Sequence, residues 1–386
     1  MHHAVRVFLT SVGLIAACAS PVQIDPSDSL KDADPGALSR IAFGSCANQR
    51  KSQPIWNAVL SAEPNLFIFM GDNVYGDVSS AEVTELKDAY AELQTVTEFQ
   101  TLRGRIPILS IWDDHDYGIN DGGSDFPYKY ATKDLFLEFW DIPPDDPRRQ
   151  REGLYYATTF GPLGQRVQVI LLDTRFFRSP LKPSDAPGSP GKEHYVPDYD
   201  PAKTMLGEEQ WTWLEQELSE PADIRLIVSS VQVIAQGHGY ERWGNLPRER
   251  NRLFELISRT NASGVIFLSG DRHIGALYKL DVGGPFPLYE VTSSSLNRPS
   301  SLKSEAGVYR LGEFYGRENF GMVAIDWVTE SVSLELRDIE GEVVRQVVIS
   351  LSEIGLPPLT GSKWKRIGKA VEELLAKERP EGEKVH

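Results

Sequence analysis

Residues 106–118 read Ile-Pro-Ile-Leu-Ser-Ile-Trp-Asp-Asp-His-Asp-Tyr-Gly, and this segment is the most informative one about the architecture of the chain. An apolar run, Ile106–Trp112, leads directly into a segment with three aspartates and a histidine. Short apolar runs are typical of buried strands, and a buried strand tolerates no unpaired charge along its length. The charged side chains are therefore expected at the point where the strand leaves its sheet.

Three other apolar runs of the chain end in the same way. The runs are Ile41–Phe43, Leu66–Met70 and Val265–Leu268, and they are followed by Gly-Ser-Cys46, Gly-Asp-Asn-Val-Tyr75 and Ser-Gly-Asp-Arg-His273. Ligands of open α/β sheets bind at the carboxyl ends of the strands, so we expect the four tips to converge on one site. The glycines before Asp72 and Asp271 are expected to let the backbone approach closely there.

From Arg40 onward the apolar runs alternate with helical patterns, which predicts an α/β fold built in layers. Runs from Ala276 onward have short spacings that favour hairpins, so we expect two packed sheets. Helices are expected over Gln53–Ala62, Ser80–Arg103, Lys129–Trp140, Gly207–Leu218 and Pro247–Arg259. Further strands are expected over Val167–Leu172, Ile224–Ser229, Ala276–Asp281, Leu288–Ser293, Gly321–Trp327, Val332–Arg337 and Val343–Ser350. Ser179–Pro201, dense in Pro and Gly, is predicted to be a long loop.

The chain has 386 residues, of which 25% are charged, and a net charge of −15. These values exclude collagen-like, coiled-coil and wholly disordered chains. The negative charge argues against a protein that neutralises nucleic-acid phosphates, so we expect no specific nucleic-acid recognition. An acidic protein that handles an anionic substrate needs local positive charge from metal ions or a few arginines.

The N-terminus is interpreted as an export signal over residues 1–17. Its apolar part, residues 7–17, is too short to span a bilayer, and the segment ends in Leu-Ile-Ala-Ala-Cys18, which resembles a bacterial lipoprotein signal. That resemblance implies lipid attachment at Cys18, the only membrane contact expected, and a periplasmic or cell-envelope location. A plain signal peptide with an incidental cysteine and an uncleaved anchor remain open alternatives. The rest divides into a linker (18–38), the main domain (39–352) and a C-terminal helix and tail (353–386).

The chain has 2 cysteines, Cys18 and Cys46, which by themselves allow one disulfide. Lipidation of Cys18 would leave Cys46 unpaired. A free thiol in an oxidising compartment is a liability unless it is buried or bound to a metal. Because Cys46 follows a strand tip beside the other clusters, metal binding is the better account of it.

Carboxylates that converge on one point repel one another unless cations lie between them. Asp72, Asp114 and Asp271, with His115 and His273, offer oxygen and nitrogen ligands for two metal ions. Two metals about 3.5–4 Å apart clamp a phosphoryl group during in-line displacement. A lone Gly-Asp is common in ordinary turns, so the prediction depends on the four clusters together.

These motifs, with Leu-Asp-Thr-Arg175, resemble the PhoD-like alkaline phosphatase/phosphodiesterase family, a branch of the calcineurin-like and purple-acid-phosphatase-like metallophosphoesterases. The similarity extends over residues 40–327. It implies a four-layer α/β/β/α sandwich with the metal site at the carboxyl-terminal tips of the strands. It also implies metal-dependent hydrolysis of a phosphomonoester or phosphodiester, with iron (Fe3+) and calcium (Ca2+) as cofactors.

The resemblance also implies metal ligands and two residues that act on the substrate. The implied ligands are Cys46 and Tyr75 on the ferric ion, Asp72 as the bridge between metals, Asp114 in place of an asparagine, Asn120, Asp271 and His273. His115 would protonate the leaving oxygen or stabilise the transferring phosphoryl group. Arg175 would clamp phosphate oxygens with its planar fork.

Departures from the wider superfamily bear on the metals. Gly-Ser-Cys46 replaces the usual Asp-x-His of the first strand, and Gln232 stands where a histidine ligand is common. Fewer histidines and more oxygen ligands favour a harder cation such as Ca2+ at one position. The sequence leaves open the preference for mono-, di- or triesters, a non-catalytic lipid-anchored binding protein, and whether Asp173 pairs with Arg175 or touches a metal.

Overall fold

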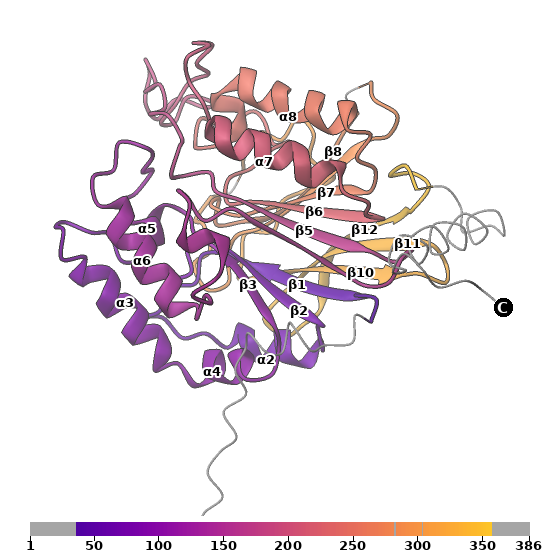
Figure 1. Ribbon diagram of the computed structural model, residues 1–386, viewed down its shortest axis with the longest axis horizontal. Coiled ribbons are helices and arrows are strands. Elements are labelled where there is room, and N and C mark those ends of the chain that lie inside the picture. The colour runs from indigo at the N-terminus through magenta and orange to yellow at the C-terminus, as the bar shows by residue number, and fades with distance from the viewer. Residues whose placement is uncertain (1–35, 282, 303, 357–386) are drawn as a thin grey trace, which may run out of the picture.

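The computed structural model describes residues 36–281, 283–302 and 304–356, and two six-stranded sheets form its centre (Figure 1). The first sheet has the strand order β12-β11-β10-β1-β2-β3 and the second has the order β4-β5-β6-β7-β9-β8. The first comprises β1 (Arg40–Gly44), β2 (Leu66–Met70), β3 (Ile108–Ile111), β10 (Phe320–Asp326), β11 (Ser331–Arg337) and β12 (Val343–Ser350). The second comprises β4 (Tyr156–Phe160), β5 (Val167–Leu172), β6 (Ile224–Ser229), β7 (Val265–Ser269), β8 (Gly275–Leu280) and β9 (Leu288–Ser293).

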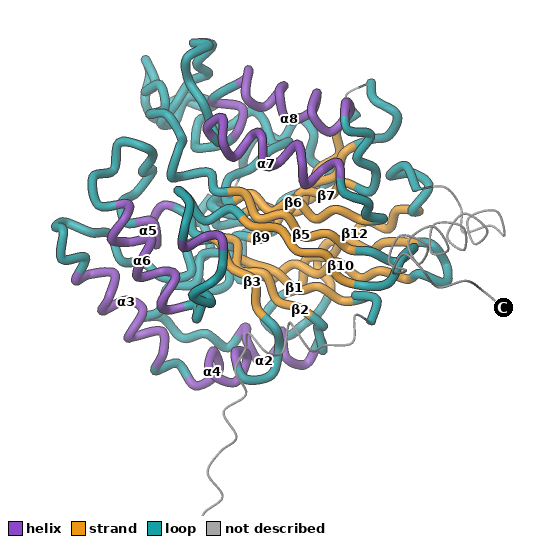
Figure 2. Tube along the Cα trace, in the orientation of Figure 1, coloured by secondary structure: helices purple, strands orange, loops and turns teal. Residues whose placement is uncertain are grey.

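Helices cover the outer face of each sheet (Figure 2). On the side of β1–β3 lie α2 (Ile55–Ser61), α3 (Thr84–Gln94), α4 (Thr97–Arg103) and α6 (Lys129–Phe139), and on the side of β5–β7 lie α7 (Gly207–Ser219) and α8 (Pro247–Arg259). The shorter helices are α5 (Asp114–Tyr117), η1 (Pro147–Arg149) and η2 (Trp243–Asn245). The predicted four-layer α/β/β/α sandwich is confirmed.

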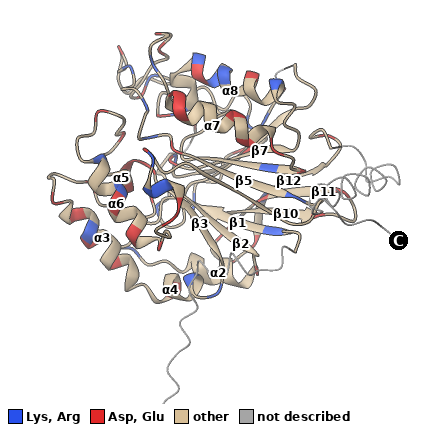
Figure 3. Cartoon of the chain, in the orientation of Figure 1, with Lys and Arg blue, Asp and Glu red and all other residues tan. Residues whose placement is uncertain are grey.

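Successive side chains along a strand pack into different layers of the fold. Val169 and Leu171 of β5 belong to the core shared by the two sheets, whereas Ile170 and Leu172 belong to a second core with Trp211 of α7. Successive strand residues point to opposite faces, and the central strands β5, β6 and β7 are buried on both sides. Most charged residues lie on the helices and loops (Figure 3), although the strands carry a few, among them Arg225, Lys279 and Glu290.

Parallel pairing places the strand tips together. In the first sheet β1, β2 and β3 are parallel neighbours, and in the second β5, β6, β7 and β9 are parallel neighbours. The carboxyl ends of parallel strands lie along one edge of a sheet. The loops that follow these strands are therefore the natural place for a site.

Most predicted elements are confirmed, and the exceptions have local causes. The strands expected over Leu66–Met70, Val167–Leu172 and Ile224–Ser229 match β2, β5 and β6 to the residue. The single helix expected over Ser80–Arg103 is wrong, because α3 ends at Gln94 and α4 begins at Thr97. The break lies at Thr-Val-Thr97, a run of β-branched residues with low helix propensity. Strand β4 and helix α5 were not predicted.

The long loop predicted over Ser179–Pro201 is confirmed, since it contains no helix or strand. The export signal, nearly all of the linker and the C-terminal helix fall outside the described residues, so those segments remain predictions. In the described part of the chain, no helix is long and apolar enough to cross a membrane.

Candidate metal centre

Four residues at the strand tips have left-handed backbones. Cys46 after β1, Asp72 after β2, and Asp271 and His273 after β7 have φ values of 62°, 51°, 67° and 57°. This conformation costs a non-glycine residue roughly 1–2 kcal/mol, and it persists where the surrounding structure imposes it. All four are predicted metal ligands, so the turns that end the strands also aim the ligands.

Two glycines let the tips approach one another. A Cβ atom on Gly71, whose φ is +99°, would lie 2.5 Å from the Asp113 backbone nitrogen. A Cβ atom on Gly270 would lie 2.5 Å from the Ser45 hydroxyl oxygen. Both distances are far below van der Waals contact, which confirms the close approach predicted for the glycines before Asp72 and Asp271.

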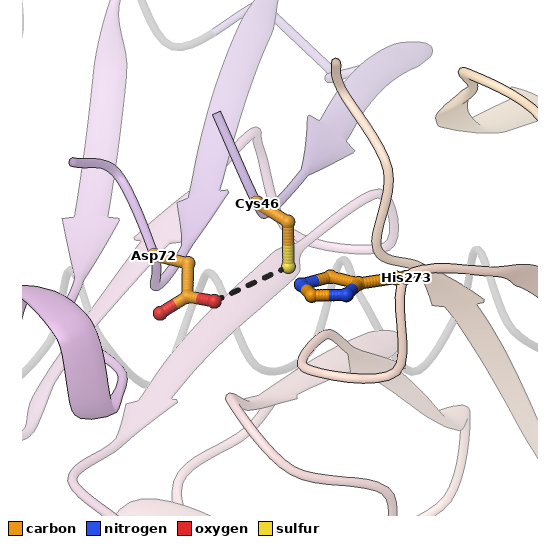
Figure 4. A group of neighbouring side chains, drawn as sticks. All are labelled: Cys46, Asp72 and His273. Carbon is orange, nitrogen blue, oxygen red and sulfur yellow. Dashed lines mark hydrogen bonds between the residues drawn. The ribbon is translucent and has the colours of Figure 1, made fainter. Parts of the chain in front are cut away.

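The first ligand group combines a thiol, a carboxylate, a phenol and an imidazole, and we call Cys46, Asp72, Tyr75 and His273 the mixed-donor group. The Cys46 thiol lies 3.4 Å from Asp72 Oδ2. The Tyr75 hydroxyl donates to Asp72 Oδ2 over 3.0 Å and lies 3.3 Å from His273 Nε2. Cys46, Asp72 and His273 come together from separate turns (Figure 4), with ligand atoms within 4.8 Å of one another. One cation can therefore bind all three.

The second ligand group contains oxygen ligands only, and we call Asp113, Asp114, Asp121, Glu241 and Asp271 the carboxylate group. Asp113, Asp114 and Asp271 have oxygens within 4.8 Å of one another, and so do Asp114, Asp121 and Glu241. Asp72 forms a further such cluster with Asp114 and His115. Asp72 thus lies between the two groups, as its predicted bridging role requires.

Burial and mutual repulsion dominate the electrostatics of both groups. Burial and the charge of Asp114 raise the pKa of Asp72 well above its usual range, and burial and the charge of Asp113 do the same for Asp271. Burial also raises the pKa of Asp113 to about 7, although Arg175 opposes it. Such carboxylates ionise together only when cations neutralise them, so the residues present fit a metal centre.

The donor types of the two groups differ. Thiolate, phenolate and imidazole ligands suit a transition metal, whereas a set of carboxylates suits a hard cation such as calcium. Burial and the nearby charge of Arg298 lower the pKa of His273 to about 3. Its imidazole is therefore neutral, which is the form that binds metals.

His115 lies beside both groups but is oriented by a residue outside them. Its Nδ1 is 2.8 Å from Asp77 Oδ1, and its backbone N–H donates to Asp72 Oδ1 over 3.3 Å. Although burial opposes it, the charge of Asp72 and the hydrogen bond to Asp77 raise the pKa of His115 to about 10. Because Asp77 occupies Nδ1, Nε2 is the ring nitrogen left to act on a substrate.

Arg175 does not lie where a phosphate clamp is needed, and this expectation is corrected. Its side chain is 0% exposed and ion-pairs with Asp113 and, over 2.7 Å, with Glu241. Its Nε also donates to Asp113 Oδ1 over 2.6 Å. Arg175 therefore holds two carboxylates in place. Asp173 forms no ion pair with this side chain and instead accepts the Arg175 backbone N–H over 2.9 Å.

Two other positions singled out in the sequence are not members of either ligand group. Asn120 is exposed on the turn after α5, next to Asp121, whose backbone N–H donates to Asp114 Oδ2 over 2.8 Å. The ligand role of Asn120 remains a prediction. Gln232, at a position of frequent histidine ligands, is hydrogen-bonded to His238 over 2.9 Å instead.

Sequence reasoning missed four residues at the site. Asp77 and Asp121 lie close in sequence to predicted ligands, and their position in the same loops is the signal that points to them. Glu241 and Arg298 lie in loops after β6 and β9 and carry no local pattern. The guanidinium carbon of Arg298 lies 4.0 Å from the centre of the Tyr75 ring.

A sequence model described as PhoD-like phosphatase matches residues 41–321, which include every member of both ligand groups. The chain belongs to the PhoD-like phosphatase family. The family resemblance predicted from the strand-tip motifs is thereby confirmed. The metal dependence of this family agrees with the two ligand groups found here.

Alkaline phosphatase D of Bacillus subtilis (strain 168) is 25% identical over 260 residues, which are 60% of this chain and 42% of that protein. The chain therefore spans less than half the length of this curated relative. The solved structure of PhoD matches with a TM-score of 0.62 at 16% identity, covering 89% of this chain and 79% of PhoD. A purple acid phosphatase, PPD1 from yellow lupin (Lupinus luteus) seeds, has a TM-score of 0.52 at 12% identity, and the match covers 84% of this chain and 58% of PPD1.

A third solved structure matches over nearly its whole length. GAP50, described as the anchor in the inner membrane complex of Plasmodium, has a TM-score of 0.54 at 14% identity, covering 91% of this chain and 98% of GAP50. These structural matches show a shared metallophosphoesterase fold and no more. A fold does not by itself decide activity, so the function must be argued from the ligand groups.

Proposed function

We propose that the protein is a metal-dependent phosphate-ester hydrolase of the alkaline phosphatase/phosphodiesterase type that acts on phosphorylated small molecules. The observation that carries this proposal is the meeting of two ligand groups at Asp72. A chain that kept the fold without catalysis would be expected to have lost several ligands. Because Cys46, Tyr75, Asp271 and His273 are all present beside Asp72, a non-catalytic binding protein is not favoured.

Bound metal ions lower the pKa of a bound water and stabilise charge on phosphoryl oxygens. The chain's own residues supply the rest. Asp72 fixes the spacing of the two groups, and Arg175 keeps Asp113 and Glu241 in place. His115, oriented by Asp77, donates a proton from Nε2 to the leaving oxygen.

For the mixed-donor group we propose Fe3+, and for the carboxylate group Ca2+. The proposal is supported by the donor types: Cys46 and Tyr75 supply anionic sulfur and oxygen, whereas the other group supplies carboxylates only. Elemental analysis of protein purified without added metal should find both ions. A visible absorption band from phenolate-to-iron charge transfer should be lost in Tyr75→Phe. Two zinc ions without iron would contradict the assignment.

The direct test is turnover of p-nitrophenyl mono-, di- and triesters by protein of known metal content. We expect hydrolysis of a monoester or diester that a chelator abolishes and added metal restores. His115→Ala should lower turnover by about 100-fold, in the range of general acid catalysis, with metal content nearly unchanged. Metal-replete protein that hydrolyses none of the three esters would overturn the proposal.

We also propose that the chain is exported and anchored through lipid on Cys18. The proposal is supported by the sequence Leu-Ile-Ala-Ala-Cys18 alone. In a bacterial host the full chain should fractionate with membranes, and Cys18→Ser should move it to the soluble fraction. Equal membrane association of both forms would contradict lipid attachment at this residue.

A further inference from the structure

Arg298 is a cation at the edge of the mixed-donor group that, among the described residues, forms no salt bridge with a carboxylate. Its guanidinium carbon lies 4.0 Å from the centre of the Tyr75 ring, and the residue is partly exposed. Among the described residues it forms no salt bridge; it is hydrogen-bonded to Tyr75 and attracted by the charges of Tyr75, Asp72 and Cys46. Its positive charge is therefore available to a ligand.

The other arginines near the site are neutralised. Arg175 is paired with Asp113 and Glu241, Arg178 lies 3.0 Å from Glu241, and Arg272 is paired with Glu305. These three guanidinium groups are buried as well as paired. The positive charges of Arg175, Arg178 and Arg272 are therefore already balanced by carboxylates and are not available to a phosphate. The charge of Arg298 is not balanced in this way.

The segment that carries Arg298 is joined to the turns of two ligands. The Asn48 backbone N–H donates to Asn297 Oδ1 over 2.7 Å, and Asn297 Nδ2 donates back to the Asn48 carbonyl over 2.8 Å. The Ser300 backbone N–H donates to the His273 carbonyl over 2.8 Å. Arg298 therefore lies between two anchored residues, and its backbone is fixed relative to Cys46 and His273.

The stacking geometry decides what the guanidinium can bind. An arginine that lies over an aromatic ring uses its flat face for the contact. One N–H group of Arg298 is hydrogen-bonded to Tyr75, and the other N–H groups of the planar fork match the oxygens of a phosphate. The Tyr75 ring thus orients Arg298 as a rigid donor at the rim of the mixed-donor group.

We propose that Arg298 binds a non-bridging phosphate oxygen of the substrate, the role that the buried Arg175 cannot fill. This inference rests on the proposed function and names a residue that binds the phosphoryl group. Because Arg298 would contact substrate and transition state alike, its loss should weaken binding more than it slows the chemical step.

The test compares Arg298→Met and Arg298→Lys in the metal-loaded full chain. Arg298→Met should raise the Kd of inorganic phosphate, measured by calorimetry, and the KM of p-nitrophenyl phosphate by about 10- to 100-fold, the range of a charge-assisted hydrogen bond. Arg298→Lys keeps the charge without the planar fork and should fall between Arg298→Met and the unaltered protein. Iron and calcium contents should not change.

Arg252→Met is the matched control. Arg252 also lies over an aromatic ring, with its guanidinium carbon 4.6 Å from the centre of the Trp211 ring, but it is on α8 and is paired with Glu208. Its loss should leave the phosphate Kd and KM unchanged. Equal effects of Arg252→Met and Arg298→Met would overturn the inference.

The outcomes separate this inference from the proposed function. If the unaltered protein hydrolyses esters and Arg298→Met leaves both KM and the phosphate Kd unchanged, the function stands and the role of Arg298 is refuted. If the unaltered protein hydrolyses none of the esters, and yet binds phosphate in a manner that depends on Arg298, the inference stands and the proposed function fails. Loss of iron in Arg298→Met with an unchanged phosphate Kd would show that Arg298 only supports Tyr75, which also overturns the inference.

Discussion

The mixed-donor group gathers a thiol, a phenol, an imidazole and one carboxylate, whereas the carboxylate group gathers oxygens alone. The arginines beside the two groups also differ. Arg298 is partly exposed and, among the described residues, forms no salt bridge, whereas Arg175 is buried and paired with two carboxylates. Arg175 neutralises part of the carboxylate group, and its remaining carboxylates still need a cation. The mixed-donor group, with its accessible cation, is the side from which we infer that an anionic substrate approaches.

The largest effect is expected from substitution of Asp72, the residue that lies next to both groups. Asp72→Asn keeps the volume of the side chain but removes its charge, so both cations should bind weakly and turnover should fall by more than about 1,000-fold. Elemental analysis and an ester assay check this. Asp88→Asn, an exposed change on α3, is the control; full turnover in Asp72→Asn would refute the bridging role.

Substitutions of the two arginines should differ most in their effect on the stability of the protein. Arg175→Met leaves Asp113 and Glu241 buried without their partner, which should lower the free energy of unfolding by about 3–5 kcal/mol. Arg298→Met removes a partly exposed charge and should cost less than about 1 kcal/mol. Denaturant unfolding of both variants measures the difference. Equal midpoints would contradict the contrast between the two sides.

The two groups should lose different metals. Cys46→Ser removes the sulfur ligand and should lower iron content while calcium is kept. Asp121→Asn removes a carboxylate oxygen and should do the reverse, since each change alters one ligand type. Each variant should lose about 10- to 100-fold in affinity for the affected ion. Parallel loss of both ions in either variant would show one indivisible centre.

The smallest expected effect concerns the residue that orients His115. Asp77→Asn should lower kcat by about 10-fold without changing KM or metal content, because Asp77 touches His115 and no ligand of either group. The loss should be larger for an alkyl phosphate than for p-nitrophenyl phosphate, since a basic leaving oxygen depends more on a proton donor. An equal loss for both substrates would count against proton donation by His115.

Much of this site follows from local sequence. Apolar runs must be buried, and charged residues directly after them must lie at strand tips, so Cys46, Asp72, Asp114, Asp271 and His273 were all found from their position. The glycines before Asp72 and Asp271 were found in the same way. The break between α3 and α4 could also have been predicted locally, from the low helix propensity of Thr-Val-Thr97.

What escaped prediction depends on partners that are distant in the chain. Asp113 and Arg175 are separated by 62 positions, and no local pattern shows that the arginine points inward to that carboxylate rather than outward to a phosphate. Glu241 completes this pair from yet another loop. Asn297 is held to Asn48 across 249 positions, which is why the role of Arg298 had no sequence signal.

The layers of the fold and the residues at the strand tips could be predicted from the sequence, because the burial of apolar runs and the rarity of charge in buried strands are local rules. The division of those residues into two groups, and the arginine that remains available, depend on contacts between loops that are distant in the chain. The physical reason is that charge neutralisation depends on distance in space. Arg175 and Arg298 carry the same group, and their packed neighbours alone make one a buried support and the other an accessible cation.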